Sequence, residues 1–423
     1  MIAPNIEAEN RFSHSTGLEN PAAWLAEYLG GNKSVSGISV NGKTVLSLPA
    51  AWSPIRTISG HIGSLPLEIR KGRHGEAPGP VIPDHRVYRL LNETPGPLQT
   101  GMVFKETLQL HSLLWGNGRA WISRDGVGRP TSLLLLPPDT VTCLVDGVKY
   151  HSIFIENDYL PEELKTNRYG SEGGNYFHFP DEDVFHIPSL GWDGIQGLNI
   201  VQLFKETFGN DKSGQQTVSY SFANNGRPGL LLEAPQQVFR TAKDAKEFLD
   251  GFNAGHEGVR NAGKTGLIRE GMKAHVLPTS AVDSQHLENR NFSREDIAKI
   301  FGTQMLLGSS AVYKNISERM TSYVQIALRP WFAKWEQETE RKLLRRSQYT
   351  ARFNAWDLLK DDPATLAVYT GQLAMQKAIT QNEIRIMHGL PPMPDPAMNR
   401  IAEPQPEQIG NDPPEPDEDD VED

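Results

Sequence analysis

The stretch that most constrains the fold is residues 291–346, which reads as a helix, a short apolar loop and a much longer second helix. Apolar residues recur at helical spacing from Ile316 to Trp335. About thirty residues at the usual rise per residue span on the order of 45 Å, longer than most globular helices. Pro330 predicts a kink, because proline removes one backbone hydrogen bond and crowds the preceding turn. The helix is expected to end in bases that favour its dipole: Arg341, Lys342, Arg345 and Arg346.

The loop between these helices carries three apolar residues, 305–307, between two glycines. Gly302 can adopt the left-handed backbone conformation that ends a helix at little cost. An apolar loop in this position is either buried within the subunit or contributes to a surface that forms only when subunits assemble. Two ordinary core helices joined by a turn are the simpler interpretation.

The acidity of the chain is concentrated at one end. The formal net charge is −10 over 423 residues, and residues 412–423 hold eight acids and no base. Removing those eight charges leaves −2 for the rest of the chain. A nearly neutral body argues against a protein that grips DNA phosphates tightly, but not against one past which DNA slides.

The length predicts two or more domains. Cys143 is the single cysteine, which excludes an internal disulfide and any multi-cysteine metal site. No apolar run is long enough to cross a bilayer, and the N-terminus lacks the pattern of a secretory signal. We therefore expect synthesis in a reducing cytoplasm and no membrane association.

The chain mixes helical and strand patterns, which predicts an α+β fold. An amphipathic helix and a strand are expected over 50–70, and a helix capped by Thr100 runs to Gly116. Short strands follow between residues 119 and 187, typical of one small antiparallel sheet or barrel. Asn199 caps a helix with a polar middle, GNDKSGQQ. Such a helix suits a solvent-lined wall or an interface between subunits better than a core. Capping pairs also begin helices at Thr241 and Thr380.

No catalytic constellation stands out. Residues 258–265, GVRNAGKT, match the phosphate-binding P-loop pattern, but that loop must follow a strand and open a helix. Here a helix precedes the motif and a strand-like segment follows it. His178 and His186 flank an acidic turn at 181–183, which we interpret as an ordinary solvated turn because zinc-ligand spacing is absent. We expect no catalytic, metal or cofactor site.

Several separated stretches resemble the portal proteins of tailed double-stranded-DNA bacteriophages, in particular the family of lambda-like siphoviruses. They occur in the expected order, are individually weak and are specific together. The matching stretches are AAWSPIRTISGHIGSLPLEI (50–69), residues 85–130, residues 183–209, SFANNGRPGLLLE (221–233), DIAKIFGTQMLLG (296–308), the long helix 316–346, and ITQNEIRIMHGLPP (379–392).

The resemblance implies a ring of identical subunits, typically twelve, and the following parts. Residues 1–44 are a partly ordered N-terminal segment and 401–423 a disordered acidic tail. Between them lie a wing with a barrel-like β-section (45–196), a stem helix (197–223), a clip (224–280), a second stem helix (281–301), a tunnel loop (302–315), a long kinked helix and strand of the wing (316–357), and a helical crown (358–400).

The resemblance also implies partners and contact residues. The ring would sit at one capsid vertex of the virion and pass double-stranded DNA, without sequence preference, during packaging and ejection. The large terminase subunit, a head–tail connector or adaptor, and the major capsid protein would bind it. Residues implied to line the channel are Thr303, Gln304, Met305, Leu306, Ser309, Ser310, Tyr313, Lys314 and Asn315. Residues implied to dock the motor or neck are Arg240, Lys243, Lys246, Arg260 and Lys264.

Two alternatives stay open. The chain could be a P-loop NTPase that uses residues 258–265, or a capsid or adaptor protein that forms no channel. The portal interpretation assigns no enzymatic activity to the chain.

Overall fold

A computed structural model describes the fold in two compact units, residues 1–355 and 356–423. The described ranges are 32–72, 79–138, 140–145, 147–154, 176–191, 193–223, 230–235, 238–239, 241–256, 271–276, 292–307, 316–345, 348–355, 358 and 363–401. The P-loop-like motif and the acidic tail lie outside them. None of the described helices is both long and apolar enough to cross a bilayer.

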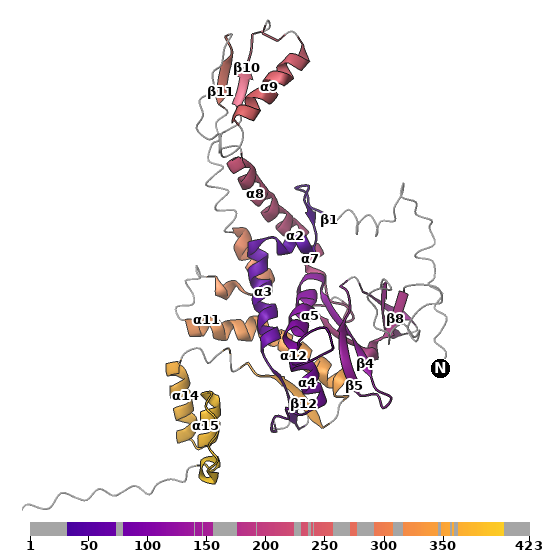
Figure 1. The fold of residues 1–423 in the computed structure, drawn as a ribbon, viewed down its shortest axis with the longest axis vertical. Helices are drawn as coiled ribbons and strands as arrows, with labels where there is room; N and C mark the ends of the chain where they lie inside the picture. The colour runs from indigo at the N-terminus through magenta and orange to yellow at the C-terminus, as the bar shows by residue number, and fades with distance from the viewer. Residues whose placement is uncertain are drawn as a thin grey trace, which may run out of the picture. The chain divides into compact units, whose positions relative to one another are not determined.

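Two packed helices, α3 (Pro49–Ser64) and α5 (Gly101–Trp115), form the centre of the first unit (Figure 1). Isoleucines of α3 at 55, 58 and 62 and the α5 side chains Phe104 and Leu108 are all buried. As expected, the Thr100 side chain accepts a hydrogen bond from the Val103 N–H, and Gly116 ends α5 in the left-handed conformation. The shorter helix α4 (Arg86–Asn92) also packs on α5, and α2 (Gly42–Leu46) packs on α3.

A strand from each end of this unit pairs beside the helices. Strand β3 (Leu67–Lys71) is antiparallel to β12 (Tyr349–Phe353), with Ile69 opposite Ala351. Helix α12 (Arg329–Glu338) packs against β12, and the Phe332 and Phe353 rings contact each other with their centroids 4.8 Å apart. The last part of the unit therefore folds back onto its beginning.

The β-section forms two three-stranded antiparallel sheets, where we expected one sheet or barrel. One sheet has the order β5 (Pro130–Leu135), β4 (Asn117–Arg124), β9 (Val184–Pro188). The other has the order β6 (Val141–Val145), β7 (Val148–Phe154), β8 (Tyr176–Pro180). The 3₁₀ turn η2 (Asp181–Asp183) carries the chain from β8 in one sheet to β9 in the other.

The two sheets share a small apolar core. Its buried members are Trp121, Leu136, Ile153, Phe177, Phe179 and Val184. Because both sheets contribute side chains, burial of apolar surface holds them against each other.

The long helix is continuous over residues 316–343 but contains two π-helical turns. The segments are α11 (Ile316–Tyr323), the π-helical turn η5 (Val324–Leu328), α12, and a second π-turn η6 (Thr339–Leu343). Pro330 lies two residues after the end of η5 and has no N–H to donate to residue 326. The π-turn η5 includes residue 326, whose carbonyl lacks the usual hydrogen bond from residue 330. The irregularity that Pro330 predicts therefore takes the form of a π-turn.

Two polar contacts join this helix to the central helices. The Trp335 indole N–H donates to Gln109 Oε1 at 2.9 Å, and the Trp335 side chain is fully buried. Tyr323, also fully buried, forms a hydrogen bond with His61 of α3 at 2.9 Å. Burial raises the pKa of the Tyr323 hydroxyl.

The helix with the polar middle is divided at Phe204 into α7 (Ile200–Leu203) and α8 (Lys205–Ala223). Asn199 caps α7, as expected, by accepting from the Gln202 N–H. The first turns of α8 contact the hairpin of β1 (Asn32–Lys33) and β2 (Ser39–Val40), where Glu206 accepts from the Val35 N–H. Among the residues whose burial is described, none between 210 and 220 is buried.

The next part of the chain forms an antiparallel pair and a helix. Strand β10 (Leu230–Glu233) pairs with β11 (Lys273–Val276). Helix α9 (Ala242–His256) begins at the expected Thr241–Asp244 capping pair, in which each residue accepts from the other's N–H. Phe239 contacts Phe248 on this helix.

The second unit contains α14 (Pro363–Met375), α15 (Gln381–Met387) and the 3₁₀ turn η7 (Pro396–Asn399). Thr380 and Glu383 form the expected capping box. Gly389, in the left-handed conformation, follows the end of α15.

One buried charge in the first unit gives a testable pH dependence. Lys105 of α5 is 2% exposed, and its ammonium donates to the Leu65 carbonyl at 2.5 Å, at the end of α3. Burial lowers the Lys105 pKa from 10.5 to about 8. Because the unfolded chain then binds the proton more tightly, the contribution of Lys105 to stability rises with pH between these two values.

We expect wild type to gain stability relative to Lys105→Met, by up to about 3 kcal/mol, as the pH rises through this window. The measurement is urea unfolding of both proteins near pH 8 and pH 10.5. Lys43→Met, at an exposed lysine of α2, is the control and should leave the pH dependence as in wild type. If the difference in stability between wild type and Lys105→Met were the same at both pH values, the lowered pKa of Lys105 would be contradicted.

Candidate functional site

The loop expected to face DNA follows a helix over residues 292–300 and begins with a Schellman motif. Gly302 has a φ of 68°, its N–H donates to Lys299 O at 3.0 Å, and the Thr303 N–H donates to Ala298 O at 2.8 Å. These bonds satisfy the last carbonyls of the helix and direct the chain sideways. The 3₁₀ turn η4 (Gln304–Leu306) follows.

Four of the nine residues expected to line the channel are described. Thr303 and Met305 are buried, whereas Gln304 and Leu306 are exposed. The other five lie outside the described residues: Ser309, Ser310, Tyr313, Lys314 and Asn315. Met305 anchors the start of the loop in the subunit, which leaves Gln304 and Leu306 facing outward.

A hollow of about 520 Å³ lies beside this loop. Thr303, Leu306 and Leu307 line it on one side and the first turns of α3, from Pro49 to Thr57, on another. Asp211 of α8 and Arg294 also line it. The hollow therefore brings together the loop, the polar part of α8 and the start of α3.

Two of the five bases expected to dock a motor or neck lie on α9. Lys243 and Lys246 are exposed, and Lys243 lies 3.8 Å from Glu247. Arg240, Arg260 and Lys264 lie outside the described residues. The described part of this segment thus presents exposed bases without a formed pocket around them.

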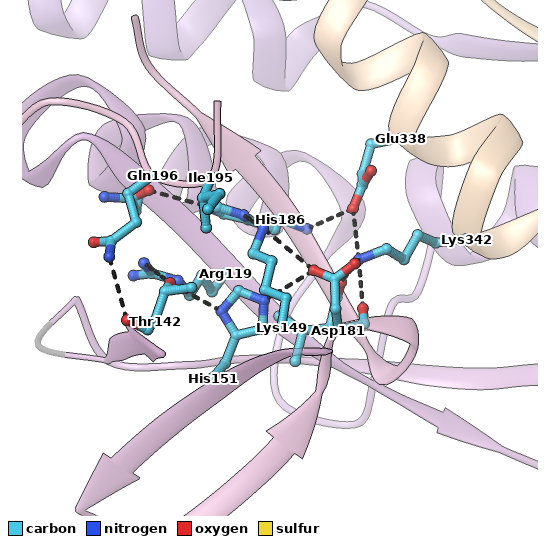
Figure 2. Close-up of polar contacts among 12 residues, drawn as sticks. Arg119, Thr142, Lys149, His151, Asp181, His186, Ile195, Gln196, Glu338 and Lys342 are labelled. Atoms are coloured by element: carbon cyan, nitrogen blue, oxygen red, sulfur yellow. Dashed lines mark hydrogen bonds and ion pairs between the residues drawn. The ribbon is translucent and has the colours of Figure 1, made fainter. Parts of the chain in front are cut away.

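The densest polar site of the first unit is a buried ionic cluster centred on Asp181 (Figure 2). The carboxylate of this η2 residue lies 3.0 Å from Lys342 Nζ, 3.3 Å from Lys149 Nζ and 2.8 Å from Arg341. It also accepts a hydrogen bond from His151 Nε2 at 3.2 Å. Burial raises the Asp181 pKa, but the His151 hydrogen bond and the charges of Lys342 and Lys149 outweigh this and hold the pKa well below its usual range.

The end of the long helix completes this cluster. Lys342, whose side chain is 3% exposed, lies 3.0 Å from Glu338 one turn earlier. Its ammonium also donates to the Asp181 and Val184 carbonyls, on both sides of the crossing between the sheets. Glu338 in turn accepts from the His186 N–H of β9 at 3.2 Å. One lysine and one glutamate therefore connect the helix to β9 and to η2, where the chain crosses between the sheets.

Two buried histidines are held neutral in this site. Lys149 donates to His186 Nδ1 at 3.0 Å, so His186 Nε2 carries the proton and donates to Asn117 Oδ1 at 2.9 Å. Burial, together with the nearby charges of Arg119 and Lys149, lowers the His186 pKa well below its usual value. Burial is also the main reason why the His151 pKa falls to about 4.

The cluster holds more positive than negative charge. Arg119 of β4 is 3% exposed and donates to Thr142 Oγ1 at 2.8 Å, and burial lowers its pKa to about 10. The Arg119 Nε–H has no hydrogen-bond partner in the described part of the chain. Such a network can fix the positions of three elements, because removing either charge of a buried pair leaves the other uncompensated.

The described residues offer no assembled metal site, since no group of three or more His, Cys, Asp or Glu side chains among them could hold an ion.

Comparison with known proteins identifies the family. The model of the family described as phage portal protein matches residues 49–389, which is most of the chain. The chain belongs to the phage portal protein family.

Two curated relatives are portal proteins of phages. The chain is 22% identical to the portal protein of Enterobacteria phage HK97 over 84% of its own length and 82% of the relative. It is 25% identical to the probable portal protein of Streptomyces phage phiC31, over 86% of its own length and 79% of the relative. Both alignments span most of each protein, so the portal protein described here is similar to them across its domains.

Solved structures share the fold. A portal protein of the HK97 family from Corynebacterium diphtheriae superposes with a TM-score of 0.53 at 15% identity, covering 75% of this chain and 96% of that one. A chain in the virion of a native gene transfer agent particle gives 0.52 at 20% identity, covering 88% and 99%. The α+β portal fold is therefore shown, and the chain is a portal vertex protein.

The sequence did not reveal the ionic cluster of this portal protein. We interpreted residues 181–183 as a solvated turn, and that was wrong, because Asp181 has a side-chain exposure of only 13%. Lys342, which we assigned to the helix dipole alone, is its buried partner. The signal in the sequence was an acidic turn at 181–183 together with Lys149 and Lys342. These lysines lie far from the turn along the chain, so the sequence gives no reason to pair them with Asp181.

Proposed function

We propose that copies of this portal protein close into a ring around an axis and form the channel through which double-stranded DNA enters and leaves the capsid. The observation that carries the proposal is helix α8, which exposes or half-exposes every side chain from 210 to 220. Tyr220, for example, is 67% exposed. A helical stretch of this length without a buried face fits a position between neighbouring subunits. Necks of gene transfer agent particles that contain chains of similar fold were computed with C12 and C6 symmetry, which supports a ring.

The parts of the ring follow the order of the chain. We assign residues 45–196 and 316–357 to the wing, 197–223 and 281–301 to the stem, and 224–280 to the clip. Residues 302–315 form the tunnel loop and 358–400 the crown. The match of the family model over 49–389 supports this assignment, because it includes the stem, the clip and the tunnel loop.

The tunnel loop is suited to brief contact with DNA. Residues 302–315 contain one base, Lys314, and no acid. Each lysine or arginine that neutralises a phosphate adds affinity and would slow the passage of DNA, so a loop with few charges favours sliding. Gln304 and Leu306 are the described side chains of this loop that face outward.

The portal has no enzymatic role in this proposal. The large terminase subunit binds the clip, uses the exposed bases of α9, and supplies the ATP hydrolysis that drives packaging. A head–tail connector later takes the same place, and the major capsid protein surrounds the wing. The portal protein is therefore located in the virion, at one vertex of the capsid.

The purified full-length chain should form closed rings and should not hydrolyse ATP. Native mass measurement gives the subunit number, negative-stain microscopy shows the opening, and a phosphate-release assay tests hydrolysis. Sheets or shells without an opening would favour a capsid protein. A monomer that hydrolyses ATP and loses this activity on Lys264→Ala would instead favour a P-loop NTPase.

A further inference from the structure

The second unit, over its described residues 363–401, has polar side chains where a small domain usually has its core. Among the residues of this unit whose burial is described, only Thr370 and Asn382 are buried. By contrast, large apolar side chains are exposed, with Met375 at 85% and Ile386 at 57%. The other exposed apolar side chains are Val368, Tyr369, Leu390, Met393 and Ile401.

Hydrogen bonds of the two buried polar side chains help to fix the shape of this unit, in which the apolar side chains of described burial are at most half-buried. The Asn382 amide donates to the Met393 carbonyl at 2.9 Å and to Asn399 Oδ1 at 2.8 Å, and its oxygen accepts from the Met393 N–H at 2.8 Å. Thr370 of α14 contacts His388, just after α15, at 3.2 Å. These bonds specify a conformation, but each contributes only about 1 kcal/mol net. A segment of roughly 40 residues without an apolar core usually needs an external partner to stay folded.

We propose that this partner is a second copy of the same unit, so that crowns of neighbouring subunits build one shared apolar core around the ring. The inference rests on the ring of the proposed function. In a ring, each unit is tethered beside two identical units, and the high effective concentration favours even weak apolar contacts.

The composition of the unit favours a protein partner of the same kind over DNA. Residues 363–401 contain two acids, Glu383 and Asp395, and three bases, Lys377, Arg385 and Arg400. Such a nearly neutral surface lacks the bases that bind phosphates, and identical copies would repel one another little. Methionines such as Met375 and Met393 are flexible and polarisable, so they adapt to the uneven gaps between repeated units.

The test compares hydrogen exchange in rings of full-length wild type and of the double variant Met375→Ser, Ile386→Ser. Wild-type rings should protect the amides of α14 and α15. The double variant should still form rings but should exchange these amides roughly tenfold faster or more, because the shared apolar surface is reduced. Gln372→Ser, Gln376→Ser, at one exposed polar position of α14 and one directly after its end, is the matched control and should exchange like wild type.

Cross-linking identifies the partner in the same rings. Met375→Cys, in a Cys143→Ser background, leaves one thiol per chain and should give a covalent dimer with a short bismaleimide linker. Intact rings that stay monomeric after cross-linking, or whose α14 and α15 amides exchange equally in wild type and the double variant, would overturn the shared core but leave the ring. Absence of rings in wild type would overturn the proposed function, and this inference with it.

Discussion

Asp181→Asn should destabilise the first unit of this portal protein by about 3–5 kcal/mol, because it leaves buried lysines without their shared counter-charge. Lys342 is nearly inaccessible to water, and Lys149 has a side-chain exposure of 20%. Asparagine has nearly the same shape as aspartate, so the loss reports charge rather than packing. The measurement is urea unfolding of full-length protein followed by tryptophan fluorescence, with hydrogen exchange of β8 and β9 to locate the effect.

An exposed ion pair provides the matched control for this variant. Asp84 lies 3.5 Å from Arg89, and its side chain is 96% exposed. Asp84→Asn should change the stability by less than about 1 kcal/mol, because water screens such pairs. Equal losses for Asp181→Asn and Asp84→Asn would show that the buried cluster does not hold the sheets and the helix together.

The stabilising effect of Asp181 should disappear in acid. Its folded-state pKa lies below the ordinary value of 3.8, so the stabilisation is present above that value and is lost as the pH falls further. The difference in stability between wild type and Asp181→Asn should therefore shrink below pH 3.8. Protonation of the buried, neutral histidines destabilises the protein over a different range. For His151, stability is lost as the pH falls from 6.5 to about 4.

Local features of this fold could be predicted from the sequence because they depend on neighbouring residues. Asn199, Thr241 and Thr380 begin helices where their side chains can reach amides of the first turn. Gly116 ends α5 because glycine adopts the left-handed conformation without strain. These signals act over three or four residues, so an isolated sequence contains them completely.

Contacts between distant residues could not be predicted in this way. Strand β3 pairs with β12 from the other end of the first unit, and Asp181 meets Lys342 from the end of the long helix. The pattern of each strand is the same whether it joins one sheet or two, so the division of the β-section was not visible either. For the candidate channel, the sequence indicated the loop, whereas the burial of Met305 depends on how the loop packs.

Gly197→Ala should be among the most damaging single substitutions in the chain, because its new methyl group has no space. An added Cβ would lie 1.9 Å from the Gly116 carbonyl oxygen and 2.4 Å from the Ser189 N–H nitrogen. Asn117 holds the same glycine from both sides, accepting from its N–H at 2.9 Å and donating to its carbonyl at 3.0 Å. The chain at Gly197 cannot move without breaking these bonds, and its neighbours are backbone atoms that cannot rotate away.

We therefore expect Gly197→Ala to cost about 3–5 kcal/mol, at the upper end of single substitutions, since it combines a backbone clash with loss of buried hydrogen bonds. Hydrogen exchange should accelerate in β4 and β9, which flank this glycine, and α7 should lose its fixed start at Asn199. Gly251→Ala is the control: no atom lies within 4 Å of its added Cβ, and alanine in helix α9 should stabilise by up to about 1 kcal/mol. If Gly197→Ala unfolded at the same urea concentration as wild type, the junction between the sheets and the stem helix would not depend on this close backbone contact.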